Sequence, residues 1–237
     1  MFAPPVCRRR WRNNAFPFRQ LGRRRRQPAN IAASGASNRT ERDARAAEEA
    51  MPLPFGDMSD HAKQILADSF GRVRELVIEL TDRLTDDIAS YRPDPGANSI
   101  AWLIWHLSRV QDDHVADLAQ VGQVWPQWRE RFALPFGKWA TGYGQGATEV
   151  AAVRASGDLL SGYHQAVHEL TMRYVAGITP AELERIVDTR WDPPVTAAVR
   201  LVSVIGDTMQ HLGQAAYVRG LAERRDSAWH QSGAAER

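Results

Sequence analysis

The chain has 237 residues, of which 43% are hydrophobic and 24% are charged, which is enough for one substantial core. No segment approaches the roughly 20 consecutive apolar residues that a membrane-spanning helix needs, so the composition excludes a membrane span. Cys7 is the only cysteine, which excludes internal disulfides and clusters of metal-binding thiolates.

Charge is divided unevenly along the chain. Residues 1–50 contain 12 Arg, no Lys and 4 acidic residues, whereas the remaining residues contain 18 basic and 24 acidic side chains. Residues 1–57 have no apolar periodicity, so we predict a disordered Arg-rich tail. Three interpretations stay open: a basic arm for nucleic acid or an anionic membrane, a transit peptide, or a start of translation at Met51 or Met58. An internal start is favoured, and nucleic acid is not an expected partner.

Two amphipathic helices are predicted first. Apolar residues recur every three or four positions from Ser59 to about Leu84, which is typical of one helix. The Pro- and Gly-containing segment "YRPDPGANS" ends it. Asn98 or Ser99 then caps a second helix, which ends near Gly122.

A long connection and a third helix are expected next. Residues 124–147 combine Pro, Gly and Trp without a sustained period, which favours a connection that covers a site or one end of the core. The third helix lies between residues 148 and 178, with an interruption at Gly157. Thr179 and Pro180 then start a short helix.

The last helix is expected from about Thr196 to Arg224, followed by a flexible C-terminal tail at residues 226–237. No strand pattern of useful length occurs in the sequence. The predicted fold class is therefore all-α: a four-helix bundle over residues 58–225, in which the long connection between helices two and three permits a crossover.

Two polar residues interrupt the apolar stripe of the last helix, in "GDTMQHLGQAAYVRG". Asp207 and His211 lie one turn apart, and a buried acid is costly unless it is paired or coordinates a metal. His106, at the edge of the apolar stripe of helix two, can point into the bundle. Three nitrogen and oxygen ligands without cysteine suit a divalent ion such as zinc, nickel or iron(II), and leave a coordination position for water or substrate.

Other interpretations of the histidines stay open. His106 alone fits a hydrogen-bonded core histidine, and Asp207 with His211 fits an i,i+4 pair on a half-exposed face. His164 and His168 have the same four-residue spacing, but their polar neighbours favour a solvated face.

Several polar neighbours of His106 and His211 are given secondary roles. Asp113 and His114 are expected to support His106 without binding the ion, or to face solvent. Arg109 is expected to be solvated, with a grip on an anionic substrate as the alternative. The glutamines that flank His211, at positions 210 and 214, are expected to be packing residues.

The segments around the three candidate ligands resemble a known family. "NSIAWLIWHLSRVQDDHVADL" and "WDPPVTAAVRLVSVIGDTMQHLGQAAYVRGL" are similar to the DinB-like, mycothiol-dependent maleylpyruvate isomerase superfamily of metal-binding four-helix proteins. The resemblance covers about residues 58–225 and implies metal ligands at His106, Asp207 and His211. Asp207 departs from the family pattern, since many members have His there and the isomerases have Glu.

The resemblance also implies a function. It indicates a metal-dependent enzyme, which we expect in the cytoplasm, that uses mycothiol or a similar low-molecular-weight thiol as a transferase or isomerase. The ion, with zinc ahead of nickel and iron, would activate the thiol as a thiolate; catalytic residues other than the ligands are not specified. The alternatives are a metal-dependent hydrolase and a non-catalytic bundle that binds a small ligand or a protein. The expected partners are a small-molecule substrate and the thiol, and a homodimer is compatible with the sequence.

Overall fold

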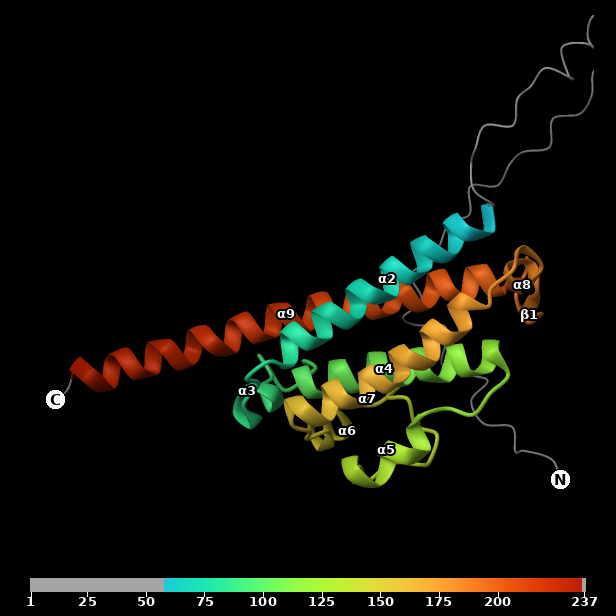
Figure 1. Cartoon of the computed structure of the whole chain (residues 1–237). Coiled ribbons are helices and arrows are strands. Elements are labelled where there is room, and N and C mark those ends of the chain that lie inside the picture. Colours follow the sequence, from blue (N-terminus) through green and yellow to red (C-terminus); the bar gives the residue numbers. More distant parts are fainter. Residues whose placement is uncertain (1–57, 236–237) are drawn as a thin grey trace, which may run out of the picture. The chain divides into compact units, whose positions relative to one another are not determined.

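The structure, a computed structural model, describes the backbone of residues 58–235 and the side chains of residues 60–225 (Figure 1). The predicted tail at residues 1–57, with its three interpretations, lies outside the described residues. Within the described part of the chain, none of the helices combines the length and apolar character needed to cross a bilayer. The elements are α2 (Met58–Thr81), α3 (Asp86–Ser90), α4 (Ile100–Ala119), α5 (Trp125–Phe132), α6 (Ala147–Ala152), α7 (Gly157–Ala176), α8 (Pro180–Glu184), β1 (Ile186–Asp188), β2 (Val195–Thr196) and α9 (Ala197–Ala235).

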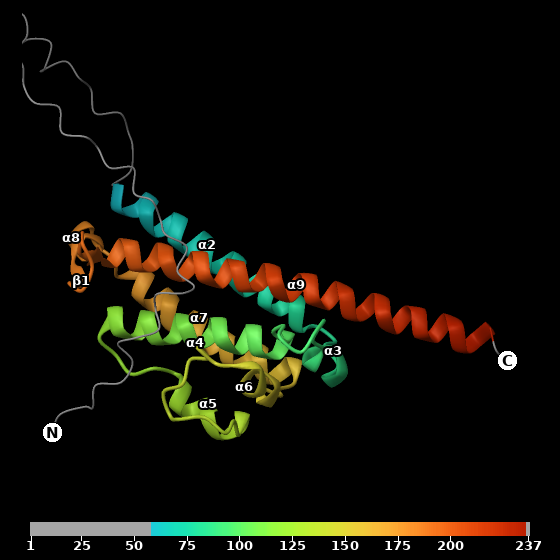
Figure 2. The same ribbon diagram turned by 180° about the vertical axis from the view of Figure 1, so that it is seen from behind.

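Four long helices, α2, α4, α7 and α9, pack around a shared core (Figure 1). Both α2 and α4 pack against α7 and α9, so α2 and α4 lie at opposite corners of the bundle. Figures 1 and 2 show α4 and α7 running in one direction and α2 and α9 in the other. The predicted all-α bundle is confirmed, and the connection between α4 and α7 is a crossover that returns the chain to the starting end of α4.

Hydroxyl side chains cap the starts of four helices, with Thr85 at α3 and three further residues at α4, α7 and α8. Ser99 accepts a hydrogen bond from Trp102 N at 3.2 Å at the start of α4, and Ser156 caps α7 in the same way. Thr179 caps α8, which begins at Pro180 as predicted. These caps satisfy backbone N–H groups that have no partner inside the first turn.

Gly157 is the first residue of α7 and not an interruption within the third helix. A Cβ atom at this position would lie 2.5 Å from the carbonyl oxygen of Thr81. The glycine therefore allows α7 to start in close contact with the end of α2. Periodicity alone gives no sign of such a contact between helices distant in sequence.

Short elements occur in three regions in which the sequence predicts none. Helix α3 lies between α2 and α4, α5 lies in the connection between α4 and α7, and a two-stranded antiparallel sheet, β1 with β2, precedes α9. Helix α6 overlaps the range predicted for the third helix, ahead of Gly157. The two strands have three and two residues, too short for an alternating pattern to be recognised.

Helix α9 continues to Ala235, beyond the predicted end at Arg224. Residues 225–232 contain neither Pro nor Gly, so nothing in the sequence stops the helix at Arg224. Figure 1 shows this last part of α9 extending past the other helices. The backbone of most of the predicted C-terminal tail is thus helical, and its flexibility stays a prediction.

Helix α4 is the most enclosed element. Every residue from Ile100 to Asp112 is buried except Val110, which is half-buried. A helix buried on nearly all sides must satisfy its polar side chains internally. The polar residues of α4 therefore determine how the crossover is held.

A buried ion pair attaches the crossover to α4. Arg109 Nη1 donates to Asp112 Oδ2 at 3.2 Å, and both side chains are fully buried. Asp112 also accepts from the backbone N–H groups of Val124 and Trp125, at 2.9 and 2.8 Å, and from the Tyr163 hydroxyl at 2.8 Å. This network joins α4 to the start of α5 and to α7.

Candidate metal centre

Three side chains from two neighbouring helices converge at one point in the bundle. Helix α4 supplies His106, and α9 supplies Asp207 and His211; the three candidate ligand atoms lie within 4.8 Å of one another. His211 Nε2 is 3.6 Å from Asp207 Oδ1, close to the roughly 3.4 Å that separates two atoms bound to one tetrahedral zinc ion. The structure thus brings together the three residues that the sequence singles out.

His106 is oriented by the crossover. Its Nδ1–H donates to the carbonyl oxygen of Thr141 at 2.5 Å, which leaves the lone pair on Nε2. Burial lowers the pKa of His106 to about 4, and the neighbouring His211 acts in the same direction. The imidazole is therefore neutral at pH 7, the state in which a histidine binds a metal ion.

His211 is oriented in the same way from its own helix. Its Nδ1 lies 2.9 Å from the side-chain oxygen of Gln214, which accepts the Nδ1–H and leaves Nε2 facing Asp207. The expectation that Gln214 only packs is wrong, because its amide fixes the tautomer of His211. The rings of His106 and His211 are 4.8 Å apart at 73°, so they approach edge to face.

Asp207 gives the strongest indication that a cation suits this position. Its Oδ2 is buried and has no hydrogen-bond partner in the part of the chain that the structure describes. Burial raises the pKa of this carboxyl, whereas His211 acts to lower it. A buried carboxylate oxygen without a donor is costly, and a metal ion would satisfy it. The donor set therefore fits a divalent ion.

A glycine of the crossover lies directly against His106. Gly142 has a φ of +94°, and a Cβ atom there would lie 2.8 Å from His106 Nδ1 and 3.2 Å from Trp102. Any side chain at this position would push the imidazole away from the carbonyl oxygen of Thr141. The sequence gives no sign of this role, because the relevant glycine is one of several in an aperiodic loop.

Side chains of α4 and α5 hold the same loop in place. Trp102 Nε1 donates to the side-chain oxygen of Gln145 at 2.7 Å, and Trp125 Nε1 donates to the carbonyl oxygen of Lys138 at 3.0 Å. Arg109 Nε donates to the carbonyl oxygen of Ala140 at 3.1 Å. The prediction that a tryptophan-rich connection covers a site thus agrees with where this loop lies.

Arg109, Asp113 and His114 do not have the roles expected from the sequence. Arg109 is fully buried and donates to protein oxygens through all three guanidinium nitrogens, so it is neither solvated nor available to a substrate. Asp113 accepts from Gln123 at 2.6 Å. His114 Nδ1 pairs with Arg200 at 3.2 Å. None of these contacts reaches His106.

The histidines of α7 lie apart from the three candidate ligands. His164 is buried, with Nδ1 3.1 Å from Ser108 Oγ, and His168 is half-buried, so the predicted solvated face is wrong for His164. Among the described residues, the group of His106, Asp207 and His211 is the only one in which three or more potential ligands meet.

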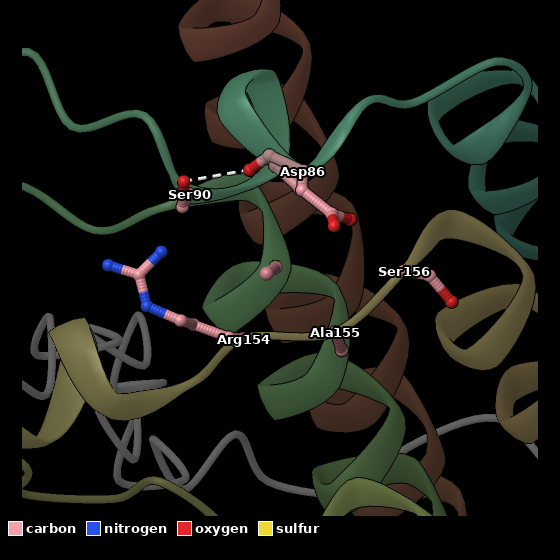
Figure 3. A pocket seen from close by; sticks show the side chains of 7 residues that line it. Asp86, Ser90, Arg154, Ala155 and Ser156 are labelled. Carbon is pink, nitrogen blue, oxygen red and sulfur yellow. Dashed lines mark hydrogen bonds between the residues drawn. The ribbon is translucent and has the colours of Figure 1, made fainter.

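A small pocket near the start of α4 is separate from these ligands. It has a volume of about 180 Å³, and Figure 3 shows it between α3 and the segment that precedes α7. Asp86 and Arg154 contribute charged side chains, both exposed to solvent. Because none of the three candidate ligands lines it, this pocket does not contain the candidate metal centre.

Comparisons with known proteins agree with the resemblance. A family model described as mycothiol-S-transferase matches residues 65–223. A solved structure, titled as a conserved protein from Enterococcus faecalis, is 34% identical to this chain with a TM-score of 0.63, and the match covers 67% of this chain and 95% of that one. No curated protein matches the chain. The chain belongs to the mycothiol-S-transferase family, a DinB-like family.

Proposed function

We propose that this protein is a divalent-metal-dependent enzyme in which His106, Asp207 and His211 hold the ion. Zinc is the first choice, with nickel and iron(II) as alternatives. The proposal is carried by the buried, unsatisfied Oδ2 of Asp207, which lies beside two imidazoles whose Nδ1 atoms already have acceptors. Each histidine therefore presents Nε2 as its free ligand atom.

The chemistry we propose is the activation of a thiol. A divalent ion held by His106, Asp207 and His211 would act as a Lewis acid that lowers the pKa of a thiol and so favours a thiolate nucleophile at neutral pH. Asp207 and the two histidines have the hard and borderline donor atoms that leave such an ion electrophilic. In this proposal the remaining residues of the site orient the ligands and exclude water.

Access to the centre is from one side. The side chains of Asp207 and His211 are 40% and 17% exposed, whereas His106 is buried. The Trp102 ring stacks on the His106 ring at 4.6 Å and closes the opposite side. The thiol and the second substrate therefore enter past Asp207, and Trp102 keeps water away from the back of His106.

The family match supports mycothiol, or a similar low-molecular-weight thiol, as one substrate. In a transfer, the sulfur forms a bond to an electrophilic carbon of a small molecule, the leaving group departs with its electron pair, and the thiol proton passes to solvent. In an isomerisation, the same bond forms and later breaks, so that the thiol is regenerated. We place this activity in the cytoplasm, where such thiols are kept reduced.

The test is thiol transfer by the purified full chain, loaded with zinc and supplied with mycothiol and a small alkylating electrophile. We expect one ion per chain and a rate that His211→Ala reduces at least 1,000-fold, because one ligand is removed. His61→Ala, which changes an exposed histidine on α2, is the matched control and should leave the rate unchanged. Full activity of His211→Ala would contradict the proposal, and turnover by the wild type without any thiol would favour the metal-dependent hydrolase.

A further inference from the structure

The outward face of α9 differs from the other exposed helix faces. Along it, small and apolar residues alternate at three and four positions: Val199, Val202, Gly206, Met209, Gly213, Ala216 and Gly220. This is the heptad spacing that packs one helix against another. In the view of Figure 2, no other helix of the bundle lies in front of α9.

Charge is missing from most of this face. The exposed residues of α9 between Val199 and Tyr217 include no acidic or basic side chain, and charged side chains return beyond Gly220, at Glu223 and Arg224. Arg200, which pairs with Asp188, and Asp207 lie at the edge that borders α4. The exposed face of α2, by contrast, carries six acidic or basic side chains: Asp60, Asp68, Arg72, Glu75, Glu79 and His61.

Large apolar side chains on this face are open to solvent. Val202 is 62% exposed and Tyr217 is 67% exposed, while Val199 and Met209 are 50% and 40% exposed. They are spaced along one side of α9, next to the exposed polar residues Ser203, Gln210 and Gln214, and monomeric proteins seldom leave large apolar patches uncovered.

Two of the three glycines of the face, Gly206 and Gly213, have no explanation within the described residues. A Cβ atom at Gly206 or Gly213 would meet nothing within 4 Å. Glycine is nonetheless the least favourable residue after proline in the interior of a helix. Two glycines one heptad apart that need no space inside the molecule indicate that something outside it comes close.

We propose that this face binds a second copy of the chain, through antiparallel packing of the two α9 helices about a two-fold axis near position 211. In this register Met209 lies opposite Gly213 of the second copy and Val202 lies opposite Gly220, so these two side chains fit over glycines, while Tyr217 lies opposite Ile205 and Val199 opposite Glu223. A two-fold interface must be self-complementary, and the uncharged middle part of this face meets its own copy without repulsion. The Arg-rich segment at residues 1–50 does not fit the same face, because its charges would lose water without gaining partners.

The size of this face determines how tight the dimer is. Residues 199–220 span about 32 Å of helix, and a strip one helix wide buries on the order of 1,000 Å² over both copies. This area is at the low end of specific interfaces, so dissociation in the micromolar range is expected. The inference does not depend on the proposed enzymatic function.

Sedimentation equilibrium of the full chain between 1 and 200 µM tests the dimer. We expect a shift from monomer towards dimer over this range. Tyr217→Glu and Val202→Glu should each raise the dissociation constant at least tenfold, whereas Ile65→Glu, at an equally exposed apolar residue of α2, should not. A monomer at every concentration overturns the proposal, and so does equal dissociation by Ile65→Glu.

Gly213→Ala provides a second test that does not depend on introducing a charge. In an isolated chain, alanine should raise the melting temperature, because the space is open and alanine favours the helix. In the dimer, the added methyl group should push the helices apart and weaken association at least fivefold. Increased thermal stability at 1 µM together with unchanged or tighter dimerisation would contradict close packing at Gly213.

Discussion

Two helices carry a candidate ligand pair with the same four-residue spacing, yet the structure gives the pairs different surroundings. On α9, Asp207 and His211 face a third ligand, His106, from α4. On α7, His164 and His168 belong to no group of three or more potential ligands among the described residues. Spacing along one helix therefore does not distinguish a metal centre from a pair of core histidines.

The electrostatic surroundings of the α7 pair also oppose a cation. Burial lowers the pKa of His164 to about 3, and His168 and Arg74 both act in the same direction. Burial also lowers the pKa of His168, with Arg74 acting in the same direction and Glu169 against it. A positive charge that disfavours imidazolium also disfavours a bound metal ion. The α9 pair, by contrast, itself contains a carboxylate, that of Asp207.

The largest expected effect comes from removing one histidine of each pair. His211→Ala should lower zinc affinity more than 1,000-fold, because it leaves two ligands, whereas His168→Ala should change it less than threefold. Titration of each full-length variant against a zinc-sensitive fluorescent chelator measures both affinities. Equal losses from the two variants would remove the distinction between the pairs.

A smaller effect is expected from the glycine that contacts His106. Gly142→Ala should lower zinc affinity about 10- to 100-fold, because the new Cβ displaces an imidazole whose orientation the crossover fixes. Gly144→Ala is the matched control, since Gly144 also has a positive φ, +73°, but has open space around its Cβ position. If both variants lose affinity equally, backbone strain and not contact with His106 is responsible.

The smallest expected effect is the change in the free energy of unfolding with pH that results from His164. Its folded-state pKa lies below the ordinary value of 6.5, so the unfolded chain binds more protons between about pH 3 and 6.5. The contribution of neutral His164 to the free energy of unfolding is fully present above about pH 6.5 and declines as the pH falls. At pH 5 about 2 kcal/mol of it is lost. Urea unfolding at pH 7.5 and 5.0, with a chelator present, measures it. The wild type should lose about 2 kcal/mol more than His164→Asn, and an equal loss would show that His164 titrates normally.

The long helices of the fold were predictable, because their apolar residues recur at helical spacing. Ser99 and Thr179 cap helices where the sequence places caps. The predicted end of the last helix is wrong, and the sequence analysis predicts neither α3, nor α5, nor the small sheet. Elements this short owe their conformation to contacts such as Asp112 with the start of α5, and no periodic pattern reports such contacts.

The three candidate ligands could be identified from sequence, but the groups that orient them could not. Asp207 is recognisable as an acid in the apolar stripe of the last helix, and His106 as a histidine at the edge of the apolar stripe of helix two. Thr141 acts through its backbone carbonyl and Gly142 through its lack of a side chain, so residue type reveals neither role. Arg109 was misjudged because a buried guanidinium is rare unless a full set of acceptors surrounds it.

Crystals of the zinc-loaded full chain, with diffraction recorded on both sides of the zinc absorption edge, test the central claim most directly. We expect one strong anomalous peak per chain, within about 2.3 Å of His106 Nε2, His211 Nε2 and a carboxylate oxygen of Asp207. A peak beside His164 and His168, or no ordered peak between α4 and α9, would contradict the account.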